Sequence, residues 1–234
     1  MVLFGAISCK KPNIVSLNIT TDDAASILSG SLTSDSYGVN NISTDISLYA
    51  QTAISSNQTC GSTQLDTLIR RSQPGSSADY YYKLIYSHKL TCNISNAPDN
   101  ITNNLSFSGN YNNARLSLTN SGTTTFTIAG LTTTATVYSL NGEYKCSGTF
   151  KLKSDTTNVG SASIDIVTKN VVINKATQVV NSGTATVIVT GSTQKRGDFT
   201  YNGTVTFNGN SMATMVINGS TYTISLLTGN ITKK

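Results

Sequence analysis

The chain has 234 residues, and charged side chains make up only 12% of them, against roughly 25% in ordinary globular domains. It contains 31 Ser, 36 Thr and 24 Asn, a single Glu, a single His and no Trp. This composition excludes coiled coils, nucleotide-binding α/β enzymes with long charged helices, and metal sites that need several His. The net charge of +5 comes from scattered bases without a basic cluster, so no nucleic-acid partner is expected.

An apolar run covers residues 1–8, ends at Cys9 and is followed by Lys10 and Lys11. This pattern is typical of the end of a secretory signal peptide. The segment Ala6-Ile7-Ser8-Cys9-Lys10-Lys11 resembles the lipobox of Bacteroidota lipoproteins of unassigned role. It departs from that family in having Ala6 where Leu is usual, and in lacking a basic region before the short apolar run.

The resemblance implies that Cys9 is the lipid-attachment residue and that acyl chains tether the protein to a membrane, where two or more chains hold almost permanently. Residues 1–20 would then be a signal-peptide remnant, the acylated Cys and a tether. Surface-exported members of the family often carry acids after the Cys. Lys10 and Lys11 therefore imply an anchor in the bacterial cell envelope, on the periplasmic side of the outer membrane.

Two helices are predicted over residues 21–56. Thr21-Asp22-Asp23 is typical of a helix start, because a capping side chain is followed by acids in the first turn. Ala24, Ile27 and Leu28 follow at helical spacing. After Gly38 breaks this pattern, apolar residues between 42 and 54 recur at steps near 3.6, which predicts a second amphipathic helix.

From residue 66 to residue 230 the apolar period is two, which predicts about ten half-buried antiparallel strands. Asn-Gly pairs at 141–142, 208–209 and 218–219 favour type I′ hairpin turns between strands. The Asn202-Gly203 pair lies inside a strand pattern and predicts a bulge. The predicted fold is therefore a single α+β domain, mostly β, over residues 21–234. Its two N-terminal helices pack on a long curved antiparallel sheet that can curl into a half-barrel, because a flat sheet of ten strands is unusual.

Four cysteines lack C-x-x-C spacing, so a zinc site is not expected. Cys60 follows the second helix and Cys92 ends a Tyr-rich strand, and outside the cytoplasm two such cysteines tend to pair. We expect a Cys60–Cys92 disulfide that contributes about 3 kcal/mol. Cys146 lies on the apolar side of its strand and is expected to be a buried free thiol.

The Tyr-rich strand suggests a ligand site. Tyr80, Tyr82, Tyr86 and His88 share one face of it, and aromatic faces stack on sugars and on lipid tails alike. The alternative is that these tyrosines fill the helix–sheet core and that His88 is a structural residue. No motif marks catalytic residues, and neither a cofactor nor a metal is expected.

The sequence therefore favours a non-catalytic envelope lipoprotein that binds a small apolar or glycan ligand between helix and sheet. The alternative is a structural or adhesive envelope protein that uses a Thr-rich face of the sheet. A cavity of several hundred Å³ between the layers would favour the first interpretation, and a solid core would favour the second.

Overall fold

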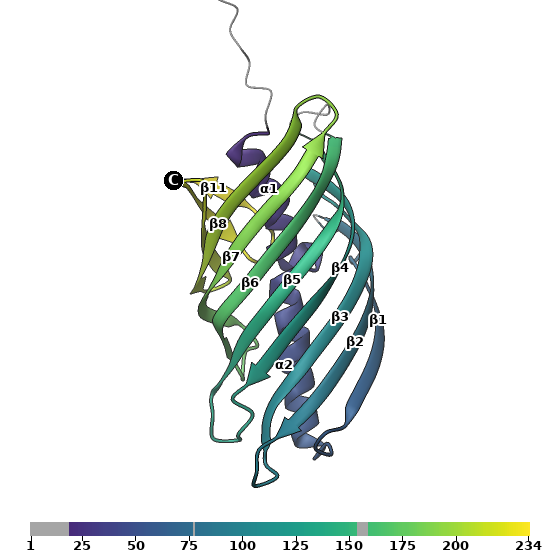
Figure 1. Cartoon of the computed structure of the whole chain (residues 1–234), viewed down its shortest axis with the longest axis vertical. Coiled ribbons are helices and arrows are strands. Elements are labelled where there is room, and N and C mark those ends of the chain that lie inside the picture. Colours follow the sequence, from purple (N-terminus) through teal and green to yellow (C-terminus); the bar gives the residue numbers. More distant parts are fainter. Residues whose placement is uncertain (1–18, 77, 154–158) are drawn as a thin grey trace, which may run out of the picture.

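The computed structural model describes residues 19–76, 78–153 and 159–234 and consists of two helices enclosed by one long sheet (Figure 1). The predicted α+β, mostly β, architecture is confirmed. The predicted lipid-attachment residue Cys9 and the tether up to residue 18 lie outside the described residues.

Helix α1 spans Thr21–Leu32, a short 3₁₀ turn η1 spans Ser34–Ser36, and helix α2 spans Val39–Ser55. Thr20 caps α1, because its hydroxyl accepts the amide hydrogen of Asp23 while the Asp23 carboxylate accepts that of Thr20. Gly38 separates the helices as the residue before α2. The sequence prediction of two helices over 21–56 is confirmed.

The sheet is an antiparallel meander in which each strand pairs with the next along the chain. The described ranges contain eleven strands, whereas about ten were predicted, and the strands extend beyond residues 66 and 230 at both ends. The last strand is too short to show an alternating pattern. The strands are β1 (Thr63–Arg71), β2 (Asp79–Cys92), β3 (Pro98–Asn112), β4 (Leu116–Ala129), β5 (Val137–Leu152), β6 (Val159–Asn174), β7 (Val180–Thr193), β8 (Gly197–Gly209), β9 (Met212–Ile217), β10 (Ser220–Ser225) and β11 (Ile231–Lys233).

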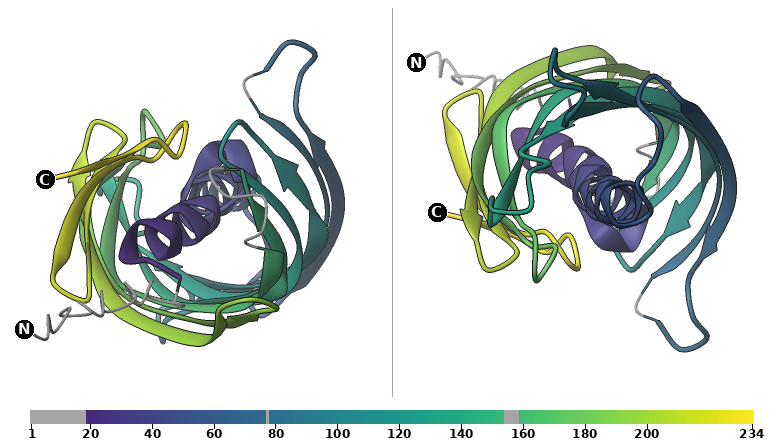
Figure 2. Two further views of the ribbon diagram at one scale, coloured as in Figure 1. Left: turned by 90° about the horizontal axis from the view of Figure 1, so that it is seen from above. Right: turned by 90° about the horizontal axis from the view of Figure 1, so that it is seen from below.

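The sheet curls around the helices as an open half-barrel, which is clear in the views along its length (Figure 2). It does not close, so β1 and β11 are its two edge strands. Glycines on the inner side help the middle strands to bend and approach closely. At Gly148, for example, a Cβ atom would collide with the carbonyl oxygen of Thr119 on β4.

The core lies between the helices and the concave face of the sheet. Ile27 and Leu28 of α1, Ile46 of α2 and Phe126 of β4 are each 0% exposed. Burial of this apolar surface, at about 25 cal/mol per Å², is the main force that holds the helices inside the sheet.

The turns only partly follow the prediction. Asn218 and Gly219 form the β9–β10 turn with positive φ at both positions, as predicted. In the β8–β9 hairpin the centre of the turn is Asn210 and Ser211, both with positive φ, so the turn lies two residues after the predicted Asn-Gly pair at 208–209. The predicted hairpin at 141–142 is wrong, because this pair lies within β5 at a register shift opposite β6. The predicted bulge at 202–203 is also wrong, because β8 pairs with β7 there without a shift.

Cys60 and Cys92 lie at disulfide distance, with their Cα atoms 5.6 Å apart, as predicted. The bridge connects the segment after α2 to the end of β2. Cys146 is a buried free cysteine, again as predicted.

Removal of this bridge should destabilise the fold measurably. A Cys60→Ser/Cys92→Ser variant should lose about 3 kcal/mol in free energy of unfolding, because the unfolded chain regains the freedom of the closed loop. Urea denaturation followed by circular dichroism measures this loss. The unmodified protein in reducing agent is the control and should lose about the same free energy; a variant as stable as the oxidised protein would contradict the assignment.

Candidate functional site

The predicted Tyr-rich site is part of the core. Tyr82 and Tyr86 are each 1% exposed and His88 is 3% exposed, while Tyr80 is only partly buried. The Tyr82 hydroxyl donates to Oδ1 of Asn120, 3.0 Å away. These side chains fill the helix–sheet interface, so a ligand could reach Tyr82, Tyr86 or His88 only if the helices moved off the sheet.

His88 lies between two aromatic rings. The ring of Tyr49 from α2 stacks on it at 3.7 Å between centroids, and the ring of Tyr86 lies at 5.1 Å. The Asn103 amide nitrogen donates to two backbone carbonyls, so its oxygen faces Nδ1 of His88 and that nitrogen must carry the proton. Nε2 of His88 then faces the carboxylate of Asp66, 3.8 Å away.

This arrangement predicts a loss of stability at mildly acidic pH. Burial lowers the pKa of His88 from its ordinary value near 6.5, although Asn103 and Asp66 partly offset the effect. As the pH falls, His88 is therefore protonated in the unfolded chain before it is protonated in the folded chain. The free energy of unfolding should fall as the pH drops from about 7 through 6.5 and towards the lower folded pKa.

Because His88 is the only His, its contribution can be isolated. The slope of the free energy of unfolding against pH, measured by urea denaturation between about pH 7 and pH 5, should flatten in His88→Gln. An unchanged slope in the variant would show that the imidazole does not titrate differently in the two states.

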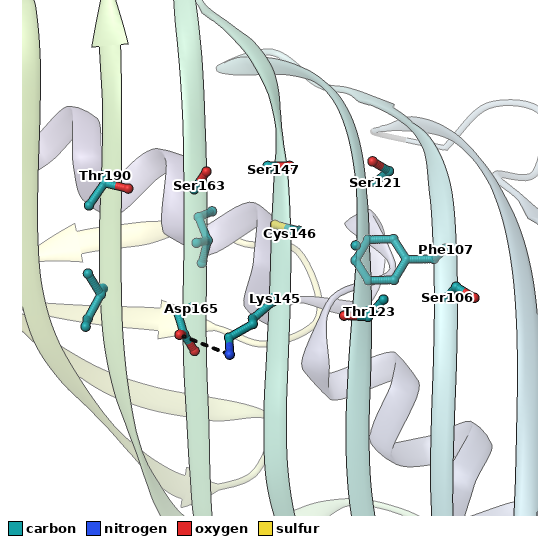
Figure 3. Close-up of a pocket in the computed structure, with 13 residues that line it drawn as sticks. Ser106, Phe107, Ser121, Thr123, Lys145, Cys146, Ser147, Ser163, Asp165 and Thr190 are labelled. Carbon is teal, nitrogen blue, oxygen red and sulfur yellow. Dashed lines mark ion pairs between the residues drawn. The ribbon is translucent and has the colours of Figure 1, made fainter.

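The outer, convex face of the sheet carries two rows of side chains that run across the strands. The first, which we call the hydroxyl row, is Ser121, Ser147, Ser163 and Thr190, each paired directly with the next on strands β4 to β7. The second, which we call the charged row, lies beside it on the same strands and contains Thr123, Lys145, Asp165 and Ile188. Figure 3 shows both rows on the side of the sheet that faces away from the helices.

A groove of about 730 Å³ lies over these rows and extends to β3. Both rows contribute to its walls, together with Ser106, and the floor is formed by residues whose side chains point inward, such as Phe107 and Cys146. A second depression of about 490 Å³ shares Ser147, Ser163 and Thr190 with it and continues towards β8. The hollow arises because small hydroxyl side chains leave space next to the longer residues of the charged row.

The charged row holds a small ion cluster. Nζ of Lys145 lies 2.5 Å from Oε1 of Glu143 and 3.8 Å from Oδ2 of Asp165. Desolvation, together with the nearby Glu143 charge, raises the pKa of Asp165, and Lys145 partly offsets this rise. Oδ1 of Asp165 is buried without a hydrogen-bond partner among the described residues.

The site offers hydrogen-bond donors and acceptors but few groups that could take part in a reaction. Its hydroxyls can donate and accept, its two carboxylates accept, and the Lys145 ammonium donates. The thiol of Cys146 is buried on the side of the sheet that the helices cover. Burial raises the pKa of this thiol, which disfavours the reactive thiolate. Over the described ranges, no three His, Cys, Asp or Glu side chains gather closely enough to hold a metal ion. The arrangement is suited to holding a polar ligand.

The sequence indicated only part of this site. Glu143 and Asp165 lie within alternating strand patterns, but no motif singles them out and nothing local connects them to Lys145 or to the hydroxyl row. These residues are brought together by the register of four strands. The one available signal is that alternate positions of neighbouring strand segments, such as Ser147 and Ser163, carry small hydroxyl residues on the polar face.

Comparison with known protein families, with curated proteins and with solved structures found no match to this chain. Neither α1 nor α2, the α-helices of the described part of the chain, has the length and apolar character needed to cross a bilayer.

Proposed function

We propose that the protein is a non-catalytic binding protein that holds a glycan in the groove on the outer face of the sheet. The observation that carries this proposal is the groove of about 730 Å³ lined by the hydroxyl row and the charged row. Its volume lies in the range of small-molecule sites, about 300–1,000 Å³.

A glycan fits the chemistry of the groove better than an apolar ligand does. Sugar hydroxyls both donate and accept, and the groove presents several hydroxyls, the carboxylate of Asp165 and the ammonium group of Lys145, beside apolar side chains such as Phe107 on which a sugar ring can pack. The Asp165 carboxylate, whose side chain is 37% exposed, would accept from such a hydroxyl. The interior favours the same choice, because the depression between α1 and the sheet beside Ile27 and Phe150 holds only about 10 Å³.

The position on a paired sheet supports binding without large rearrangement. Each residue of the hydroxyl row lies in a strand with hydrogen-bonded neighbours on both sides. Such side chains are held in place before the ligand arrives, which lowers the entropic cost of association.

We place this binding protein in the bacterial cell envelope as a lipoprotein. The support is the sequence around Cys9, whose acyl chains would anchor the protein in the outer membrane, and Lys10 and Lys11, which favour the periplasmic side. The bacterial glycan available at that location is peptidoglycan, which makes its soluble fragments the natural probe.

A structural or adhesive role is the second candidate. It is favoured by the filled core and by Thr side chains that continue along the outer face beyond the groove, such as Thr186 opposite Thr204. In that case the outer face would contact a macromolecular surface broadly, and isolated sugars would bind weakly.

Isothermal titration calorimetry with soluble peptidoglycan fragments tests the proposal. We expect saturable binding of the glycan at one site, and no saturable binding of a fatty acid tested in parallel. Saturable binding of the fatty acid without glycan binding would overturn the proposal and favour an interior site. Binding to intact sacculi without binding to soluble fragments would favour the structural role.

A further inference from the structure

Strand β1 has a free edge, where backbone N–H and C=O groups are available to pair with a further strand. The amide of Ser72 donates to Tyr80 on β2, and the amide of Leu90 on β2 donates to Ser62, so even-numbered residues of this segment bond to β2. In an antiparallel ladder the alternate residues point their backbone groups the other way. The N–H and C=O groups of Thr63, Leu65, Thr67, Ile69 and Arg71 therefore face outward from the sheet.

No backbone partner for these five residues is present within the described part of the chain. The opposite edge, β11, is protected differently, because it has only three residues and ends in Lys233. Short, Lys-bearing edges discourage pairing with other chains. β1 has nine residues, and its apolar side chains Leu65 and Ile69 are 75% and 59% exposed on the outer face.

The strand is also held in place. Arg70 of β1 forms an ion pair with Asp45 of α2, with 3.2 Å between the guanidinium nitrogen and the carboxylate oxygen. The whole length of β1 is paired with β2, from Thr63 opposite Lys89 to Arg71 opposite Tyr81. An edge that is ordered in this way can accept a further strand at a lower entropic cost.

We propose that β1 pairs antiparallel with β1 of a second copy of this chain, so that two sheets join into one. The register centred on Thr67 places Thr67 opposite itself and Leu65 opposite Ile69 of the second copy. By symmetry, the contact between Leu65 and Ile69 occurs twice, once on each side of the two-fold axis. All five outward-facing backbone positions can form hydrogen bonds in this register. Apolar and Thr–Thr cross-strand pairs each stabilise a sheet modestly.

The charges of β1 select the antiparallel direction. Asp66 lies in the first half of the strand, and Arg70 and Arg71 lie at its end. Antiparallel pairing centred on Thr67 places Asp66 of one copy diagonally across from Arg70 of the other on the same face of the sheet, whereas parallel pairing would set like charges side by side. Because only nine residues pair, the contact is small compared with a standard interface, so the dimer should form at micromolar or higher concentrations.

A cysteine cross-link tests both the contact and its register. In a Cys146→Ser background, Thr67→Cys should form a disulfide-linked dimer on mild oxidation, because Cα atoms of a hydrogen-bonded antiparallel pair lie about 5.5 Å apart. The matched control is Thr186→Cys, an exposed Thr on the same face of β7 in the middle of the sheet. We expect at least about ten times more covalent dimer from the first variant than from the second.

Light scattering of the uncross-linked protein gives an independent readout. The mass should rise towards that of a dimer between about 1 µM and 500 µM, and Leu65→Lys/Ile69→Lys should remain monomeric while keeping its circular dichroism spectrum. A monomer over the whole range, or equal cross-linking of the two Cys variants, would overturn the proposal. The glycan groove does not include β1, so these outcomes are independent of glycan binding.

Discussion

The double variant Ser147→Glu/Ser163→Arg should lose glycan binding while it keeps its fold. The two residues lie directly opposite each other on β5 and β6 in the hydroxyl row, and both point away from the core. Long side chains at these positions would fill the groove, and their opposite charges would form a cross-strand pair that the exposed face tolerates. Calorimetry with soluble peptidoglycan fragments should show at least about a hundredfold loss of affinity, or about 2.7 kcal/mol.

A matched control is available on the same face. Thr186 and Thr204 are also directly opposite each other, on β7 and β8, and do not line the groove. The Thr186→Arg/Thr204→Glu variant introduces the same charges and should bind within about twofold of the unmodified protein. Equal loss of binding in both variants would point to a general charge effect and contradict the groove as the site. Unchanged binding in Ser147→Glu/Ser163→Arg would exclude the groove directly.

The variant Phe126→Ala should be strongly destabilised. Phe126 is 0% exposed on the inner face of β4, within the core that the helices cover. Truncation removes apolar contacts and leaves a cavity, so the free energy of unfolding should fall by about 3–5 kcal/mol. Urea denaturation measured by circular dichroism gives this value.

The control for this prediction is Leu48→Ala on α2. It also removes a large apolar side chain, but Leu48 is 46% exposed, and surface substitutions usually change stability by less than about 0.5 kcal/mol. If Phe126→Ala lost as little free energy of unfolding as Leu48→Ala, the assignment of a filled core between the helices and the sheet would be wrong. The interior would then regain room for an apolar ligand.

The elements of this fold are visible in the sequence because each has a period that extends over many residues. The spacing of Ile27 and Leu28 and of the residues between 42 and 54 indicates helices, and the long alternation after residue 66 indicates strands. The turns were harder to predict, because an Asn-Gly pair permits positive φ without requiring a hairpin. At Asn218 and Gly219 the strands end, whereas at Asn141 and Gly142 pairing with β4 continues through the pair, and pairing with β6 resumes at Gly142 after a register shift.

The site was harder to predict than the fold. The Tyr-rich strand looked like a binding face because its aromatic residues gather in one short segment. The two helices cover that same face, so Tyr82 and Tyr86 became core residues. The groove instead depends on the register of β3 to β7, which places Ser147 opposite Ser163 and Lys145 opposite Asp165. Residues that are 16 and 20 positions apart, respectively, meet only after the meander forms, and their local sequences do not show this.

An NMR titration of the isotopically labelled protein with soluble peptidoglycan fragments tests the central claim most directly. Binding in the groove predicts saturable shifts of amide signals concentrated at Ser121, Ser147, Ser163 and Thr190, with little change at Leu28 or Ile46 in the helices. Shifts concentrated at the helix–sheet interface, or the absence of any saturable shift, would contradict a glycan site on the outer face.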